Sequence, residues 1–390
     1  MRGYVTAPWH LLTVLVLAGC GGSMQKSSAA DPEYNAVLLG RQMVVQHACG
    51  ECHGGGDNPA AQGWLQGVQP TDTFLVGTMR TFPRNLTPDS ATGIGGYTER
   101  QIFNALRFGL RPSATPDVVI TSTVPGQGNH PAQPKYLAPD MPWMAWRHMS
   151  DDELRAIAAY LKRGLKPVSH KVPDSEAPPD AWASEYTVEK IGPYPAAAYP
   201  TEREIPPASV PSEIREKVLR GRFLTLQHAC SGCHGSSVDP TDADYLGGMT
   251  RPDQEFTVGG FKTRPRNLTP DNTTGLGRFS ERQIFNALRF GLRPGETPDV
   301  EITSNVPGQG NFPLAPKYLA PPMPWPAWRH MPDADLWAIA AYLKHGVKPL
   351  RNRVPDSEGP PDFWASGYTV ERIGPHPAAP FPTQNEIGVR

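Results

Sequence analysis

Residues 49–53 read Cys-Gly-Glu-Cys-His, and residues 230–234 read Cys-Ser-Gly-Cys-His, 181 positions further along the 390-residue chain. Cys-x-x-Cys-His is the attachment sequence of c-type haem. Its two thiols add to the two vinyl groups of one porphyrin, and the adjacent histidine ligates the iron from the proximal side. The doubled motif predicts two covalently bound haem c groups. The predicted thioether and proximal residues are Cys49, Cys52 and His53, and Cys230, Cys233 and His234.

Other interpretations of the cysteine pairs are weaker. A thioredoxin-like dithiol needs a βαβ context, which the surrounding sequence lacks. A structural zinc site needs four ligands, whereas each motif supplies three and neither half has a second cysteine pair. Two short-range disulfides would leave both histidines unexplained. The fifth cysteine, Cys20, lies outside both motifs and belongs to a separate signal.

The N-terminus resembles the export signal of a bacterial lipoprotein. Arg2 precedes an apolar run over 11–17 that is too short to span a bilayer. The run ends in Leu-Ala-Gly-Cys, which resembles a lipobox and implies cleavage before Cys20 and its lipidation. An ordinary secretory signal with an incidental cysteine is the alternative. We expect a signal peptide over 1–19, a flexible tether over 20–33, and an exported protein that is lipid-anchored facing the periplasm or at the outer membrane.

Composition bounds the fold class and the partners. Lys plus Arg is 37 and Asp plus Glu is 38, and the net charge of −1 argues against a nucleic-acid partner. The chain has 45 prolines and 38 glycines, and alternating strand-like runs are scarce. This pattern favours an all-α fold of short helices joined by long, Pro-rich loops and tails.

The chain is an internal duplication. The sequence ERQIFNALRFGLRP occurs at 99–112 and again at 281–294. Similarity extends over most of each half, so the chain is long enough for two tandem domains. We place the first domain at 34–205, a Pro-rich linker at 206–215 and the second domain at 216–390.

Each half predicts the same three helices. The first helix, at 36–47, leads into the haem motif. It contains Gly40, which recurs as Gly221 in the second half and suits a close contact between helices. The second opens at Thr98 with a capping box to Gln101 and ends at Gly109. The third has a buried apolar stripe and runs over 151–162.

The distal iron ligand must lie far along the chain from the haem motif. Two methionine pairs recur, namely Met141 with Met323 and Met149 with Met331. Met149 directly precedes a predicted capping box, where a hydrophobic staple explains it. Met141 lies in a loop stiffened by prolines and flanked by aromatic residues, so we favour Met141 and Met323 as distal ligands, with core packing as the alternative.

Several other recurring residues are weaker candidates. His47 is too close to His53 to reach the opposite face of the haem, whereas His148 is an outside candidate for bis-histidine ligation. Guanidinium groups suit carboxylates, so six arginines are candidates for contacts to the haem propionates, with a solvated helix face as the alternative. These are Arg84, Arg107, Arg111, Arg266, Arg289 and Arg293.

Each half resembles a class I cytochrome c domain. It is most similar to the cytochrome c subunits that accept electrons from membrane-associated alcohol and sugar-acid dehydrogenases. The resemblance is carried by the haem motifs, by segments 85–95 and 154–161, by Met141-Pro142-Trp143, and by their copies in the second half. It implies histidine and methionine as the proximal and distal ligands of both irons. The chain differs from that family in having two haem motifs where the family has three, so the resemblance does not fix the redox partner.

These features predict an electron-transfer protein and not an enzyme. Histidine and methionine fill both axial positions, so electrons move without a substrate on the metal, and the thioether raises the reduction potential. The expected partners are a donor dehydrogenase or quinol-oxidising complex, an acceptor cytochrome or oxidase, and the membrane through the lipid anchor. The alternatives are a two-haem peroxidase, a haem-based sensor with one open iron, and a structural lipoprotein.

Overall fold

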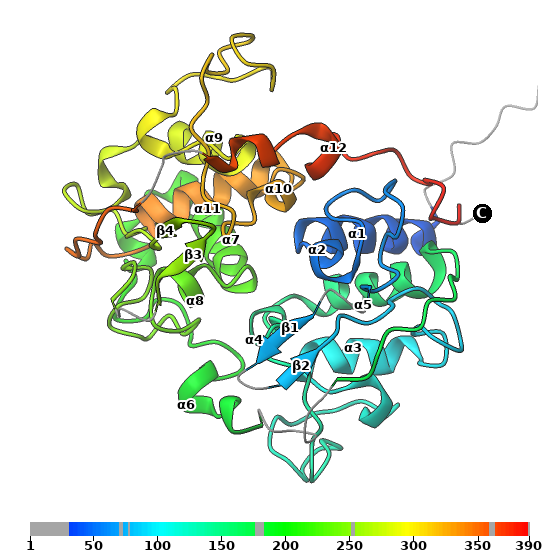
Figure 1. The fold of residues 1–390 in the computed structure, drawn as a ribbon. Helices are drawn as coiled ribbons and strands as arrows, with labels where there is room; N and C mark the ends of the chain where they lie inside the picture. The colour runs from blue at the N-terminus through cyan, green and yellow to red at the C-terminus, as the bar shows by residue number, and fades with distance from the viewer. Residues whose placement is uncertain are drawn as a thin grey trace, which may run out of the picture.

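The computed structural model describes residues 31–69, 73–76, 79–175, 183–250, 254–358 and 363–388. The chain folds into two similar, mostly helical halves that lie side by side (Figure 1). Each half is built around one large cluster of buried apolar side chains, and a smaller cluster lies under its long loop. The predicted signal peptide and Cys20 fall outside the described residues.

The first half contains six α-helices and one hairpin among the residues that the structure describes. These are α1 (Pro32–Gln46), α2 (Cys49–His53), β1 (Phe74–Val76), β2 (Met79–Thr81), α3 (Glu99–Phe108), α4 (Trp143–Trp146), α5 (Asp151–Ala159) and α6 (Val188–Ile191). A π-helical turn, Tyr160–Gly164, continues α5. Short 3-10 turns follow at Pro112–Ala114, Ala183–Glu185, Pro207–Ser209 and Ser212–Ile214.

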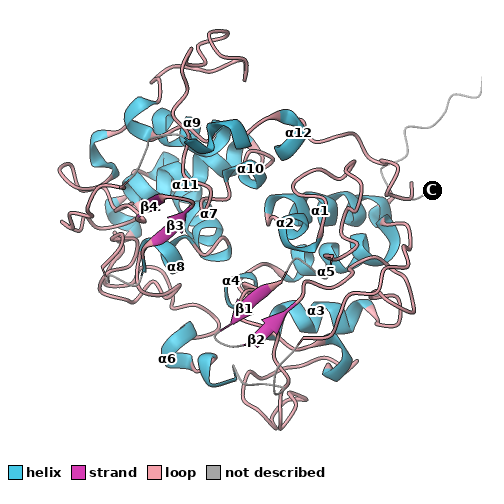
Figure 2. Ribbon diagram, in the orientation of Figure 1, coloured by secondary structure: helices cyan, strands magenta, loops and turns pink. Residues whose placement is uncertain are grey.

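The second half repeats this order. It contains α7 (Arg215–Gln227), α8 (Cys230–His234), β3 (Phe256–Val258), β4 (Phe261–Thr263), α9 (Glu281–Phe290), α10 (Trp325–Trp328), α11 (Asp333–His345) and α12 (Val370–Ile373). The two hairpins are antiparallel and pair Phe74 with Thr81 and Phe256 with Thr263 (Figure 2). The sequence did not predict them, because strands of three residues are too short to show an alternating pattern.

The predicted helix signals are confirmed. The Thr98 hydroxyl accepts a hydrogen bond from the backbone of Gln101, whose side chain accepts in return from the backbone of Thr98. Ser150 and Glu153 form the same capping box at the start of α5. Gly109 ends α3 in the left-handed region, with φ of 67°. The helix α1 begins earlier than expected, because Asp31 caps it and Pro32 starts it.

The crossing of α1 over α5 needs a glycine. A Cβ atom on Gly40 would lie 1.8 Å from the carbonyl oxygen of Ala156, and one on Gly221 would lie 1.9 Å from that of Ala338. No other residue lets these backbones approach so closely. The predicted close helix contact is therefore present in both halves, and it holds α1 and α7 against the C-terminal helices.

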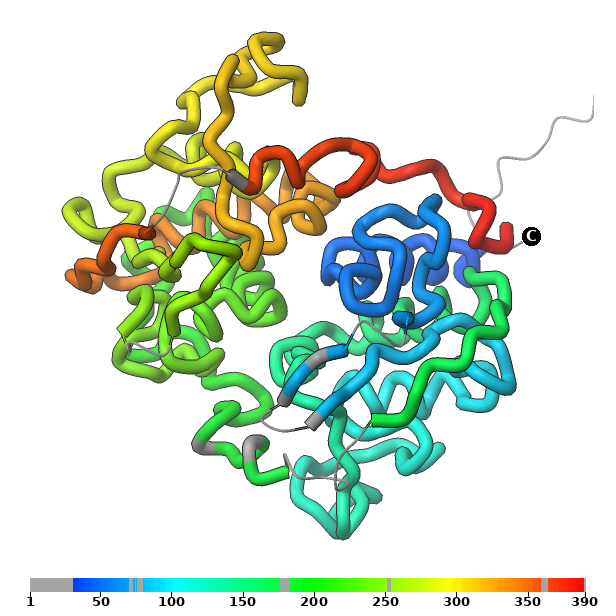
Figure 3. Tube along the Cα trace, viewed as in Figure 1, coloured from blue at the N-terminus to red at the C-terminus, as the bar shows by residue number. Residues whose placement is uncertain are grey.

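The end of each repeat packs on the other half. The Glu386 carboxylate lies 2.6 Å from Nε of Arg41 and accepts a hydrogen bond from the Tyr160 hydroxyl at 2.6 Å. The C-terminal segment thus returns to the first half, as the red trace in Figure 3 shows. In the second half, Glu204 makes the equivalent contacts with Arg222 and Tyr342. Two copies of one ion pair join the halves.

Among the described residues, the structure has no helix with the length and apolar character needed to cross a membrane.

Candidate haem sites

A cavity of about 1490 Å³ opens in the first half beside the haem motif. Cys49, Cys52 and His53 of α2 line one part of its wall, and Met141 lines another. Much of the remaining wall is apolar and comes from four segments of the first half: Val44, Leu86, Ile94, Ile102, Leu106, Ile157 and Leu161. The fold therefore brings the predicted attachment residues and the predicted distal methionine to one apolar cavity.

The His53 imidazole is oriented for metal binding. Its side chain is 8% exposed, and its Nδ1 lies 2.7 Å from the carbonyl oxygen of Arg84. A carbonyl only accepts hydrogen bonds, so Nδ1 carries the proton and Nε2 keeps the lone pair that iron requires. Burial also lowers the pKa of His53, which favours the neutral ring. His234 repeats the arrangement, with Nδ1 2.6 Å from the carbonyl oxygen of Arg266, and burial lowers its pKa as well.

The loop that carries Met141 is fixed by its neighbours. The Met141 backbone N–H donates to the carbonyl of Ala138 at 2.9 Å, and the Trp143 N–H donates to the carbonyl of Met141 at 2.8 Å. The Trp143 indole stacks on Tyr136 with centroids 5.9 Å apart, and Tyr186 contacts both rings edge-on. Met141 is only partly buried, against the main cluster of its half. Such a loop holds the thioether in place without using it as core.

Met149 and His148 are not in the wall of this cavity, whereas His47 is. Met149 is fully enclosed in the main apolar cluster, as a hydrophobic staple requires. The His148 ring lies 5.8 Å from Tyr194, and burial lowers its pKa to about 3. Of the two recurring methionines of the first half, Met141 is therefore the one that shares this cavity with the haem motif.

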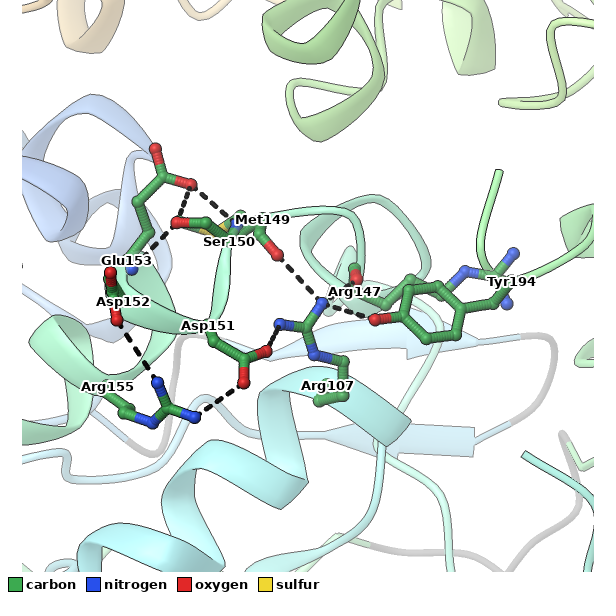
Figure 4. A network of polar contacts seen from close by, with 9 residues as sticks. All are labelled: Arg107, Arg147, Met149, Ser150, Asp151, Asp152, Glu153, Arg155 and Tyr194. Carbon is green, nitrogen blue, oxygen red and sulfur yellow. Dashed lines mark hydrogen bonds and ion pairs between the residues drawn. The ribbon is translucent and has the colours of Figure 1, made fainter. Parts of the chain in front are cut away.

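The candidate arginines of the first half separate into two groups. Arg84 and Arg111 line the cavity, although Arg84 also donates to the carbonyl of Val172 and to Asp174. Arg107 is buried outside the wall, and Figure 4 shows its guanidinium surrounded by other acceptors. It donates to the carbonyls of Arg147 and Met149, the Tyr194 hydroxyl and the Asp151 carboxylate. These contacts give Arg107 a structural role.

The second half repeats these contacts. Arg289 donates to the carbonyls of Arg329 and Met331 and to Asp333. Arg266 donates to the carbonyl of Val354 at 3.1 Å and to Asp356 at 3.0 Å, as Arg84 does to its counterparts. Arg293 uses Nε to donate to the carbonyl of Tyr318 at 3.0 Å.

The residues present fit haem c. The four motif cysteines form no disulfide, much of the cavity wall is apolar, and His53 has the tautomer that an iron ligand needs. Cys49 and Cys52 would hold the porphyrin through thioethers, and His53 and Met141 would supply the two protein ligands of the iron.

Comparison with known proteins agrees with this chemistry. Identity is 26% over 347 residues with the gluconate 2-dehydrogenase cytochrome c subunit of Pantoea cypripedii, which covers 84% of this chain and 64% of that protein. Identity is 24% over 342 residues with the fructose dehydrogenase cytochrome subunit of Gluconobacter japonicus, covering 86% of this chain and 58% of that protein. This chain is similar to dehydrogenase cytochrome c subunits.

A shorter cytochrome relative matches over almost its whole length. The diheme cytochrome c-type protein of Cereibacter sphaeroides is 24% identical over 369 residues, which is 88% of this chain and 98% of that protein. By contrast, the chain spans only 58% to 64% of the length of the two dehydrogenase subunits. No protein-family model matches the chain. The cytochrome similarity therefore rests on these relatives and on the motifs.

Sequence reasoning missed the part of the cavity wall that the second half supplies. Residues of its haem-motif segment, of the loop around Met323, and of the segment that ends with α12 line the cavity of the first half: His228, Ala229, Pro321, Pro324, Trp328, Tyr368 and Arg372. One signal was available, since Gln-His-Ala precedes both haem motifs, at 46–48 and 227–229.

A buried carboxyl distinguishes the two sites. Asp57 lines the cavity of the first half and is 2% exposed, and neither carboxyl oxygen has a hydrogen-bond donor. Burial, with Glu51 nearby, raises the pKa of Asp57 to about 8, although Arg329 acts in the opposite direction. The position 181 residues later is Val238, so the second half lacks this group.

Proposed function

We propose that this protein is a di-haem c-type cytochrome that carries electrons between redox partners, with one His/Met-ligated haem in each half. The observation that carries the proposal is the cavity in which Cys49, Cys52 and His53 share a wall with Met141. The second half supports it by repetition, because Cys230 and Met323 both pack against its main apolar cluster. Similarity to cytochrome c subunits of dehydrogenases supports the electron-transfer role.

The residues around each site set its chemistry. Haem c, when bound, supplies an iron that exchanges one electron between its ferric and ferrous states. The carbonyl of Arg84 accepts from Nδ1 of His53 and so keeps that ring in one orientation and tautomer. Met141 supplies a soft thioether, which favours the ferrous state, and the apolar wall disfavours the extra charge of the ferric state. Both features raise the reduction potential.

A histidine and a methionine would together hold each iron and leave no position for a substrate, so in this proposal the chain transfers electrons and does not itself catalyse a reaction at the metal. Relatives named as subunits of gluconate and fructose dehydrogenases support a dehydrogenase as electron donor. A quinol-oxidising complex is the other donor class, and a cytochrome or an oxidase is the acceptor. We place the protein outside the cytoplasm, anchored through lipidated Cys20, because its N-terminus resembles a lipoprotein signal.

Ligand substitution tests the proposal. In the purified holoprotein, Met141→Ala and Met323→Ala should each remove half of the far-red absorption that Met-to-iron ligation gives the ferric protein. Each should also lower one of the two midpoint potentials, because a thioether ligand is lost. Met149→Leu is the matched control, since it changes a recurring methionine outside the cavity wall. Unchanged spectra and potentials in both alanine variants would overturn His/Met ligation.

A further inference from the structure

The two halves meet through the segments that enter their haem motifs. The imidazoles of His47 and His228 stack with centroids 4.3 Å apart and planes inclined by 12°. Trp146 contacts His47 edge-on at 6.1 Å, and Trp328 contacts His228 edge-on at 5.7 Å. We call Trp146, His47, His228 and Trp328 the ring bridge. It joins each half to its counterpart through equivalent residues.

The stack at the centre of the ring bridge is formed by equivalent residues of the two repeats. Gln-His-Ala-Cys occurs at 46–49 and again at 227–230, so His47 stacks on its own counterpart in the other repeat. Burial lowers the pKa of His47 to about 3 and that of His228 well below its usual value, so both rings are neutral. Neutral rings stack closely without the repulsion that two imidazolium ions would have. Neither Nε2 atom has a hydrogen-bond partner.

All four rings of the bridge line the cavity that contains His53 and Met141. The same wall includes Ala229, which precedes the first cysteine of the second haem motif, and Pro321 and Pro324 of the loop that carries Met323. The attachment segment and distal loop of the second site therefore border the first site directly.

We propose that electrons pass directly between the two haem sites across the ring bridge, with His47 and His228 as positioning residues. The inference rests on the proposed di-haem function. With one haem c held by His53 and Met141 and another by His234 and Met323, one electron would leave the reduced site and be taken up by the oxidised site, with no bond or proton exchanged. Closely packed rings keep the attachment segments in contact, whereas a void between them would remove those contacts.

Flash photoreduction of the holoprotein measures this step. A Met323→His background lowers the potential of the second site and makes its spectrum distinct, so that electrons move on to the first site. The first-order phase that does not depend on protein concentration reports transfer between the sites. The test compares His47→Ala/His228→Ala with His47→Phe/His228→Phe, which keeps two stacked rings. His148→Ala is the control, because His148 is a recurring, largely buried histidine outside the cavity wall.

We expect the alanine pair to slow this phase by about tenfold or more, equivalent to about 1.4 kcal/mol in activation free energy. The phenylalanine pair and the His148 control should retain the parent rate. The proposal is overturned if the alanine pair keeps the parent rate with both haems attached, if the phenylalanine pair is equally slow, or if the control slows as much. It is also overturned if the parent shows no first-order phase while each haem accepts electrons from the photoreductant. That last result leaves the carrier function intact, whereas a chain without two attached haems would refute the carrier function itself.

Discussion

Substituting Glu386 by alanine should destabilise the protein far more than the loss of a surface ion pair would. The Glu386 side chain is 0% exposed, and its Oε1 lies 2.6 Å from Nε of Arg41, which is itself mostly buried. The same oxygen accepts a hydrogen bond from Tyr160 at 2.6 Å. Alanine at position 386 leaves both the Arg41 guanidinium and the Tyr160 hydroxyl without this carboxylate partner. Breaking a buried pair on one side costs about 3–5 kcal/mol, whereas an exposed pair contributes about 0–1 kcal/mol.

Urea unfolding of the holoprotein, followed by the Soret band, gives the free energy of unfolding. Glu204→Ala is the matched variant, because Glu204 makes the same contacts with Arg222 and Tyr342 in the second half. The double substitution Arg41→Met/Glu386→Leu should recover much of the loss, because it removes both charges together. A loss below about 1 kcal/mol for Glu386→Ala would mean that its charge is effectively solvated, and would refute the docking of the C-terminal segment on the first half.

Gly40→Ala should lower the free energy of unfolding by about 1–3 kcal/mol, because the new Cβ atom would meet the backbone of the facing helix. Gly96→Ala is the control in the same urea assay and should cost little, because no atom lies within 4 Å of its Cβ position. Asp57→Val should remove a pH dependence of the free energy of unfolding. The pKa of Asp57 is about 8 in the folded protein and near 3.8 in the unfolded chain, so the folded state binds more protons between these two pH values. The free energy of unfolding should therefore fall as the pH rises from about 4 to about 8 in the native chain, and should change less in the variant. Equal slopes of unfolding free energy against pH in the two proteins would contradict this prediction. Arg107→Gln should lower the free energy of unfolding by about 1–3 kcal/mol and leave both haem potentials unchanged, because Arg107 donates to backbone carbonyls outside the cavity. Arg111 lines the cavity, so Arg111→Gln should shift the potential of the first haem. A shift of potential in the Arg107 variant would contradict its structural role.

The local features of the fold were readable from the sequence. The capping box of Thr98 and Gln101 depends on residues three positions apart, and Gly40 marks a close helix contact by its repetition at Gly221. The haem motif likewise carries its chemistry within five residues, 49–53. Such signals are local, so no knowledge of the tertiary structure is needed to find them.

Contacts between the halves could not be predicted in the same way. Glu386 pairs with Arg41 across 345 positions of sequence, and nothing near either residue indicates the other. Arg84 and Arg107 recur equally well, yet one lines the cavity and the other is tied to backbone carbonyls. Repetition shows that both halves use a residue, but only the packing shows what it contacts.

In the proposed function, the chain holds two haems, each with a methionine ligand. The absorption spectrum of the purified ferric holoprotein, recorded with the number of attached haems per chain, tests it most directly. We expect two haems per chain and a far-red Met-to-iron band whose intensity matches both of them. A band that is absent or half as strong, or high-spin features in the spectrum, would contradict it. Such a spectrum would show that at least one iron lacks its methionine.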